Sequence, residues 1–232
     1  MKTISIVCYN RPAYLSRTLE SLKQCDWSGY SLFLAIEKGA PAAVVDICNK
    51  VDWIPTQVHI ATHKLGCDRN TYRSIQLPFD AGSEFNIYWE DDIECSRGLR
   101  ELADWYEKYN DRENACMCLE SYTDRNSPTN EIRSFKGFNS HGLMCNAWQF
   151  NTHFRKQWLD HTLSDKTKHG WDWNMMNYIT THPTLKILAP MHAYSHHIGE
   201  VGTYCNAEVY HRLGQHTVVL CHDKHNDWYF KA

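Results

Sequence analysis

The first 92 residues alternate short apolar runs of strand length with segments of helical periodicity. Such alternation is typical of βαβ units, in which parallel strands form one sheet and right-handed crossovers place helices on both of its faces. We therefore expect an α/β protein with a Rossmann-like, mostly parallel central sheet between helices. The predicted strands are 4–8, 32–36, 58–61 and 85–89, and the predicted helices begin near Pro12, Pro41 and Arg69.

The second half of the sequence has a less regular pattern. It contains no internal repeat and no linker, so residues 1–232 are predicted to form a single domain. The polar stretch 121–142 predicts a long loop. Helices are expected over 99–109, 154–163 and 171–179, and strands over 115–119, 147–150 and 185–189.

Composition excludes several classes of protein. Hydrophobic residues make up 43% and charged residues 22%, which excludes a disordered chain, a collagen and a coiled coil. A net charge of -3 provides no overall attraction to nucleic acid or anionic lipid. No apolar run reaches the roughly 18 residues of a membrane helix, and the run 4–8 is too short for a signal peptide. We therefore expect a cytoplasmic protein without a membrane span, whose Cys residues are mostly free and buried.

Three acids, Glu90-Asp91-Asp92, directly follow the predicted strand 85–89. Ligands of open α/β sheets bind at the carboxyl ends of the strands. Adjacent carboxylates repel one another and are stabilised by a nearby cation, and Mg²⁺ or Mn²⁺ prefers such oxygen ligands. The pattern fits a divalent metal site and, equally, a solvated acidic turn.

Two further segments carry groups suited to chemistry. Ser195-His196-His197 contains two imidazoles, and a neutral imidazole could provide the last ligand of a metal site. A pair of surface histidines is the alternative. In Gly170-Trp171-Asp172-Trp173, an apolar setting would raise the pKa of the carboxyl group and suit a general base, and the indole faces would stack on sugar rings. The alternative for this segment is a core-packing Trp pair with Asp172 capping a helix.

A fourth segment, Gly66-Cys67-Asp68-Arg69-Asn70, precedes a predicted helix. Gly66 allows a ligand to approach the backbone closely, and either Arg69 is a candidate partner for a phosphate or Asn70 for a hydrogen bond to a base. A plain helix N-terminus capped by Asp68 is the alternative.

Taken in this order, the segments resemble glycosyltransferases of the GT-A fold. Residues 4–12 resemble the opening strand and turn of that fold, and Tyr88 to Glu94 resembles its acidic DxD metal motif, here in the form EDD. His197-Ile198-Gly199 resembles a His-containing C-terminal element, and Gly170-Trp171-Asp172 resembles the region that supplies the base in inverting members. The resemblance covers most of residues 3–200.

The resemblance implies a metal-dependent enzyme that transfers a sugar from a nucleotide-sugar, with a UDP-sugar favoured, to an acceptor hydroxyl. Residues 1–92 would form the nucleotide-sugar-binding half and 93–232 the acceptor-binding half. Asp92 and His197 would hold Mn²⁺ or Mg²⁺, Asp172 would act as the base, and Trp171 and Trp173 would contact the acceptor. The implied donor-binding residues are Tyr9, Asn10, Arg11, Glu37, Arg69 and Asp91.

Other functions fit parts of the pattern. A nucleotide-sugar-binding protein without transferase activity would need no base. The presence of Asp172, a candidate base, counts against this alternative. A nucleotidyltransferase usually carries a Gly-rich loop, absent from residues 9–12, and no HExxH segment supports a hydrolase. The acceptor is left open between a glycan, a protein, a small molecule and, for a viral or phage enzyme, hydroxymethylated DNA. Cations that would form a local basic patch for DNA are Arg125, Arg133, Lys136, Arg212, Lys224 and Lys231.

Overall fold

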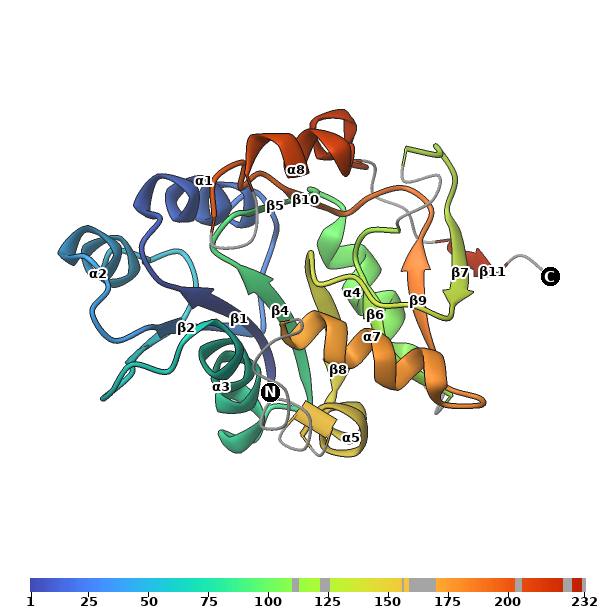
Figure 1. Ribbon diagram of the computed structural model, residues 1–232, viewed down its shortest axis with the longest axis horizontal. Coiled ribbons are helices and arrows are strands. Elements are labelled where there is room, and N and C mark those ends of the chain that lie inside the picture. The colour runs from blue at the N-terminus through green and yellow to red at the C-terminus, as the bar shows by residue number, and fades with distance from the viewer. Residues whose placement is uncertain are drawn as a thin grey trace.

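The protein is a layered α/β structure built around one large mixed sheet (Figure 1). The computed structural model describes residues 1–109, 113–121, 126–155, 157–158, 170–202, 206–222 and 227–230. The strands are β1 (Lys2–Cys8), β2 (Tyr30–Ile36), β3 (Thr56–Ile60), β4 (Phe85–Glu90), β5 (Ile93–Cys95), β6 (Asn114–Cys118), β7 (Glu131–Phe135), β8 (Leu143–Asn146), β9 (Lys186–Pro190), β10 (Ser195–His197) and β11 (Tyr229–Phe230). The helices are α1 (Pro12–Leu22), α2 (Ala42–Asn49), α3 (Cys67–Asp80), α4 (Leu99–Lys108), α5 (Ala147–Gln149), the π-helical turn η1 (Phe150–Phe154), α7 (Trp171–Thr181), α8 (Ala207–Arg212) and the 3₁₀ turn η2 (Gln215–Thr217).

Nine strands form the main sheet in the order β11-β7-β9-β6-β8-β4-β1-β2-β3. Strands β3, β2, β1 and β4 are parallel neighbours, as the βαβ pattern predicts. The next strand, β8, is antiparallel to both β4 and β6, and β6 is again parallel to β9. The carboxyl ends of β1, β2, β4 and β6 therefore meet at one edge of the sheet, which is where ligands are expected in such folds.

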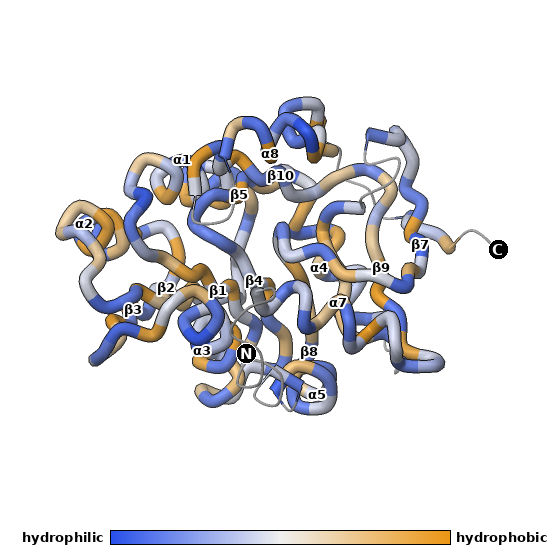
Figure 2. The backbone as a smooth tube through the Cα atoms, in the orientation of Figure 1, coloured by the Kyte–Doolittle hydropathy of each residue, from blue (hydrophilic) through white to orange (hydrophobic). Residues whose placement is uncertain are grey.

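Helices cover both faces of the sheet, and each face has its own apolar cluster. Residues of α1, α2 and α4 pack on one face together with the strand residues Ile6, Leu34 and Trp89. Residues of α3, η1 and α7 pack on the other face, where Tyr88 also lies. The α3 and α7 side faces the viewer in Figure 1, and Figure 2 shows hydrophobic residues concentrated along the central strands. Successive side chains of β4 point to opposite faces of the sheet, so this strand contributes to both apolar clusters.

Most of the predicted elements are confirmed, with boundaries shifted by a few residues. The strand predicted over 147–150 is wrong, because Asn146 and Gln149 form a capping box that starts the short helix α5 there. The preceding residues 143–146 form the strand instead. The predicted loop 121–142 contains β7, and most of the helix predicted over 154–163 lies outside the described residues.

The described cysteines are all free, as predicted. Eight of them are buried, and Cys67 is exposed; Cys205 lies outside the described residues. None of the helices within the described parts of the chain is long and apolar enough to cross a bilayer.

Candidate active site

Polar side chains from several strand ends surround a cavity of ≈ 700 Å³ at the carboxyl edge of the sheet. Pockets for small ligands fall in the range of about 300–1,000 Å³, so the space suits a ligand of nucleotide size. Its lining residues are Val7, Cys8, Tyr9, Asn10, Arg11, Glu37, Lys64, Gly66, Cys67, Asn70, Thr71, Glu90, Asp91, Asp92, His197, Val201 and Gly202.

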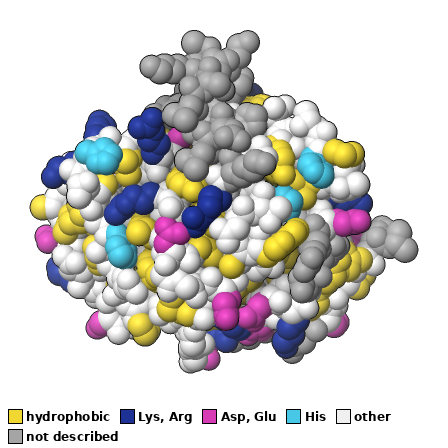
Figure 3. All heavy atoms as spheres, turned by 90° about the horizontal axis from the view of Figure 1, so that it is seen from below, with side chains coloured by type: hydrophobic (Ala, Val, Ile, Leu, Met, Phe, Trp, Pro, Cys, Tyr) yellow, Lys and Arg dark blue, Asp and Glu magenta, His cyan; other side chains and the backbone are white. Residues whose placement is uncertain are grey.

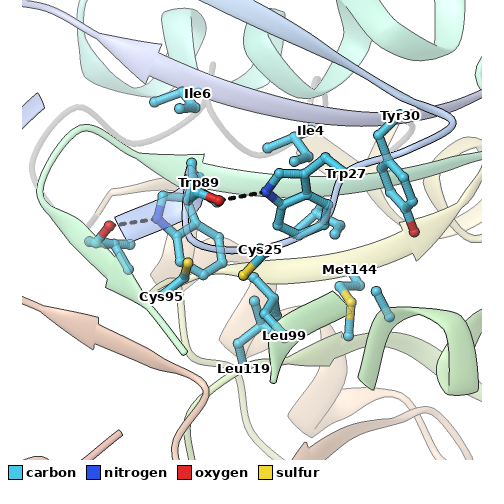
Figure 4. Close-up of a cluster of buried hydrophobic side chains, with 14 of the residues drawn as sticks. Ile4, Ile6, Cys25, Trp27, Tyr30, Trp89, Cys95, Leu99, Leu119 and Met144 are labelled. Carbon is cyan, nitrogen blue, oxygen red and sulfur yellow. Dashed lines mark hydrogen bonds between the residues drawn. The ribbon is translucent and has the colours of Figure 1, made fainter. Parts of the chain in front are cut away.

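The acidic triplet ends β4 with the half-buried Glu90 and forms the turn to β5 with Asp91 and Asp92. Trp89 is buried in the hydrophobic cluster shown in Figure 4. Its indole N–H donates a 2.6 Å hydrogen bond to the carbonyl of Ile93 and so connects the two ends of the turn. Asp91 is 2% exposed and Asp92 is fully buried. The alternative of a solvated acidic turn is therefore excluded, and these carboxylates require compensating partners.

Arg11 supplies one such partner. Its guanidinium pairs with Asp91 Oδ1 through Nη2 at 2.5 Å and with Asp92 Oδ2 through Nη1. The backbone N–H of Tyr9 donates to Asp91 Oδ2 at 3.1 Å. The predicted donor-binding residues Tyr9, Arg11 and Asp91 are thus brought together by the neighbouring strands β1 and β4.

His197 reaches the same carboxylate from the opposite half of the chain. Strand β10 pairs antiparallel with β5, with His197 opposite Ile93, and Nε2 of His197 lies 3.0 Å from Asp92 Oδ2. The other oxygen, Asp92 Oδ1, is buried and has no hydrogen-bond partner. A buried carboxylate oxygen with no partner next to an imidazole fits the oxygen and nitrogen ligands of a divalent ion such as Mn²⁺.

Burial shifts the pKa values of the carboxyl groups in the turn. Burial and the charge of Asp92 raise the pKa of Glu90 to about 8, and burial raises that of Asp91 to about 6 despite Arg11. Burial also opposes ionisation of Asp92, but its hydrogen bond to His197 and the charges of His197, Arg11 and His141 together outweigh this effect and hold its pKa below the ordinary value. Asp92 is therefore the member of the triplet best suited to ligate a metal.

Two further ionisable residues belong to this region, although the sequence did not reveal them. Glu120 follows β6, and its Oε2 lies 3.0 Å from Nδ1 of His141. The His141 ring stacks on the His197 ring with centroids 4.8 Å apart and planes 10° apart. Glu120 follows the end of β6 at the same edge of the sheet as the acidic triplet, whereas no pattern in the sequence marks His141.

The predicted donor residue Glu37 supports the loop before α3. Its carboxylate accepts the backbone N–H groups of Lys38, Leu65 and Gly66 at 2.7, 3.0 and 2.7 Å. Gly66 has a φ of +81°, which favours glycine at this turn. Glu37 lines the cavity, and its contact with a donor stays a prediction.

The helix after this loop does not bring Arg69 to the cavity. Residues 69 and 70 point in different directions because successive residues of a helix are about 100° apart. Asn70 is buried and lines the cavity, while Arg69 is exposed. The basic residues that line the cavity are Arg11 and Lys64, and Nζ of Lys64 lies 5.9 Å from the centre of the Tyr9 ring.

Asp172 lies in the first turn of α7 and is not among the residues that line the cavity. Burial raises the pKa of its carboxyl group, while backbone N–H groups at the helix start and the charge of His141 act in the opposite direction. Asp68 accepts the backbone N–H of Trp171 at 3.1 Å, which fixes the start of α7 against α3.

The two Trp residues that flank Asp172 have different environments. Trp171 is 3% exposed and packs against the rings of Tyr88, Phe138 and Trp158. The expectation that Trp171 presents its ring to an acceptor is therefore contradicted, because the ring is part of the core. Trp173 is 56% exposed.

Comparison of the fold with known structures identifies its type. No protein-family model and no curated protein matches the sequence. Among solved structures, residues 1–349 of S. aureus TarS match with a TM-score of 0.57 at 11% identity, covering 91% of this chain and 62% of that one. The mannosyltransferase PcManGT from Pyrobaculum calidifontis, in complex with GDP-Man and Mn²⁺, matches with a TM-score of 0.52 at 12% identity, covering 82% and 54%. GlyE of Streptococcus pneumoniae TIGR4, a glycosyltransferase, matches with a TM-score of 0.52 at 15% identity, covering 79% and 44%.

The chain shares the fold of known glycosyltransferases. It spans less than two thirds of the length of these three structures. Within this fold, the acidic turn and His197 are among the residues that line the cavity.

Close packing around Asp92 depends on Gly199. A Cβ atom added there would lie 2.0 Å from Asp92 Oδ2 and 3.0 Å from His197 Nε2. We expect Gly199→Ala to displace the carboxylate and to weaken metal-dependent nucleotide binding by about 10- to 100-fold, since small displacements of ligands and of their supporting residues have effects of this size. Calorimetric titration measures the change.

Gly137→Ala is the matched control, because a Cβ there meets only Met176 Sδ at 3.8 Å. Equal affinities for the two variants would show that the position of the Asp92 carboxylate does not matter for binding.

Proposed function

We propose that the protein is a divalent-metal-dependent glycosyltransferase that transfers a sugar from a nucleotide-sugar, a UDP-sugar being the first choice, to an acceptor hydroxyl. The observation that carries the proposal is the buried, unpartnered Oδ1 of Asp92 beside His197, at the edge of a nucleotide-sized cavity in a glycosyltransferase fold. This combination supports an enzyme rather than a structural protein.

Asp92 and His197 would be the protein's metal ligands. Within the described residues no three His, Cys, Asp or Glu side chains form a ready-made metal cluster, so oxygens of the donor diphosphate and water would complete the coordination. The ion, Mn²⁺ or Mg²⁺, would neutralise charge on the departing diphosphate. The solved complex of PcManGT with GDP-Man and Mn²⁺ supports this choice of ion.

The donor would occupy the cavity over the ends of β1 and β4. Tyr9 and Asn10 line its wall, and Lys64 adds a positive charge beside the Tyr9 ring. A diphosphate near Arg11 and Lys64 would be stabilised by both cations. The proposed donor half is 1–92 and the proposed acceptor half is 93–232. His197, Val201 and Gly202 of the second half also line the cavity, so the two halves would differ in role without being separate domains.

The proposed chemistry is a single inverting displacement. The Asp172 carboxylate accepts the proton of the acceptor hydroxyl, whose oxygen forms a bond to the anomeric carbon. The bond from that carbon to the diphosphate oxygen breaks, and the nucleoside diphosphate leaves with the electron pair. Burial raises the pKa of Asp172, which suits a base, and the exposed Trp173 beside it would offer an aromatic face to a sugar acceptor.

The acceptor class stays open between a glycan, a protein, a small molecule and hydroxymethylated DNA. Of the cations considered for DNA, Arg133 pairs with Glu131, and Lys136 donates to the backbone carbonyls of His182 and Pro183. On the face that lies below in the view of Figure 1, charged side chains of both signs are interspersed (Figure 3). Arg125, Lys224 and Lys231 lie outside the described residues.

Titration with UDP-sugars and GDP-sugars, with and without Mn²⁺, tests the proposal. We expect one donor series to bind in the micromolar to millimolar range typical of enzyme substrates, and to require the metal. Product formation with an acceptor panel then distinguishes a transferase from a protein that only binds nucleotide-sugars. No binding of any donor in the presence of metal would overturn the donor site.

A further inference from the structure

The guanidinium of Arg11 occupies the acidic turn in the way that a metal ion would. It bridges Asp91 Oδ1 and Asp92 Oδ2 with two nitrogens. Arg11 is itself largely removed from solvent, with 26% of its side chain exposed, and the two carboxylates are almost fully buried. Burial works against the charged guanidinium, but Asp92 and Asp91 hold its pKa above the ordinary value. The turn is therefore electrically compensated by the protein's own cation.

A divalent ion held by Asp92 and His197 would lie next to the Arg11 guanidinium even if it used the unpartnered Asp92 Oδ1. Asp92 Oδ2 accepts from Arg11 and also lies 3.0 Å from His197 Nε2, so one oxygen is shared by two side chains. A dication between Asp92 and His197 would lie within a few ångströms of the guanidinium, where like charges repel strongly in a buried setting. Metal binding therefore requires Arg11 to withdraw from Asp92.

The structure leaves room for that withdrawal. Arg11 starts the turn into α1 and lines the cavity, so its side chain has open space on one side. Gly202 lies beside the guanidinium, and a Cβ added there would make a tight contact of 3.3 Å with Nη1, so the missing side chain of this glycine keeps the space next to the guanidinium free. A diphosphate in the cavity would offer the guanidinium a second, bidentate partner of the same charge type as the carboxylates.

We propose that Arg11 is a built-in counter-ion that suppresses divalent metal binding until a nucleoside diphosphate draws its guanidinium away from Asp92. This inference rests on the proposed function, because it assumes that the metal and the diphosphate share this cavity. Metal and nucleotide then bind with positive coupling, and by linkage each increases the affinity for the other by the same factor. Arg11 carries that coupling.

The test is titration of the full chain with Mn²⁺ alone and with Mn²⁺ in the presence of UDP or GDP, followed by calorimetry and by the Mn²⁺ electron paramagnetic resonance signal. Arg11→Met removes the charge and keeps an unbranched side chain. We expect this variant to bind Mn²⁺ alone at least 10-fold more tightly than the wild-type chain. We also expect the factor by which the nucleoside diphosphate strengthens Mn²⁺ binding to fall at least 10-fold.

Arg17→Met is the matched control, because it removes one positive charge from the same helix and leaves the acidic turn untouched. Arg17 pairs with Glu94 and is 55% exposed. Its Mn²⁺ affinity is expected to equal that of the wild-type chain. Arg11→Lys keeps the charge but cannot form the two-nitrogen bridge, so an intermediate Mn²⁺ affinity is expected and remains measurable if Arg11→Met does not fold.

Weaker or unchanged Mn²⁺ binding by Arg11→Met and Arg11→Lys would overturn the inference. Mn²⁺ binding that is equally strong with and without a nucleoside diphosphate in the wild-type chain would also overturn it. These results differ from failure of the proposed function, in which the wild-type chain binds no nucleotide at any Mn²⁺ concentration.

Discussion

Replacing Asp172 with Asn is expected to lower the turnover number by about 10²- to 10⁴-fold, the usual contribution of a general base, while donor affinity stays within about threefold of the wild-type value. Asn keeps the size of the side chain and its ability to accept from the backbone N–H groups at the start of α7, so the helix should remain in place. What it loses is the capacity to accept a proton. Steady-state kinetics with donor and acceptor, together with donor titration, measure both quantities.

Asp68→Asn is the matched control for this experiment. Asp68 is a neighbouring carboxylate that accepts the backbone N–H of Trp171, and an Asn oxygen would still accept that hydrogen bond. A large loss of turnover for Asp68→Asn, with little loss for Asp172→Asn, would indicate that the base is Asp68 of α3 and not Asp172 of α7. That result would contradict the proposal.

The pH dependence of turnover should follow from the same carboxyl group. Burial raises the pKa of Asp172. A base acts only when ionised, so turnover should fall as the pH drops through this raised pKa, at a higher pH than the value near 3.9 of an ordinary Asp. The acidic limb of the profile is expected to disappear in Asp172→Asn.

The regular part of the fold could be predicted because its strands are long, apolar and separated by clear helix starts. Strands β1, β2 and β4 are buried on both faces, so their sequences are largely apolar, with only a few polar residues such as Ser5 and Asn86 among them. Strand β7 was missed because it is polar, with Glu131 and Arg133 on a strand near the sheet edge. Strands β5 and β10 have three residues each, too few for any periodicity to be visible.

The site was predictable where a functional residue directly follows a strand. Asp91 and Asp92 follow β4, and the structure brings His197 to them through the pairing of β10 with β5. Arg69 was chosen for its charge, yet the phase of α3 places Asn70 at the cavity instead. His141 comes from a loop, and only the tertiary structure shows that its ring stacks on His197.

Replacing Asp92 with Ala is expected to abolish metal-dependent donor binding, with a loss of affinity of at least about 100-fold. The variant loses the unpartnered Oδ1 and the oxygen that faces His197, so one of the two proposed protein ligands is gone. Losing a metal ligand outright should exceed the 10- to 100-fold effect of losing a supporting residue. Arg11 keeps its pairing with Asp91, so the fold around the turn is expected to survive. Calorimetry with the donor and Mn²⁺ measures the loss.

Glu94→Ala separates this effect from a general loss of negative charge. Glu94 lies two residues further along the chain, and its carboxylate pairs with Arg17 outside the cavity. Donor and Mn²⁺ binding should be unchanged in that variant. The comparison with Arg11→Met is equally direct, because the two substitutions remove opposite members of one ion pair. If Asp92 is the metal ligand and Arg11 its competitor, Mn²⁺ affinity must fall in the first variant and rise in the second, and a change of the same sign in both would rule out this assignment.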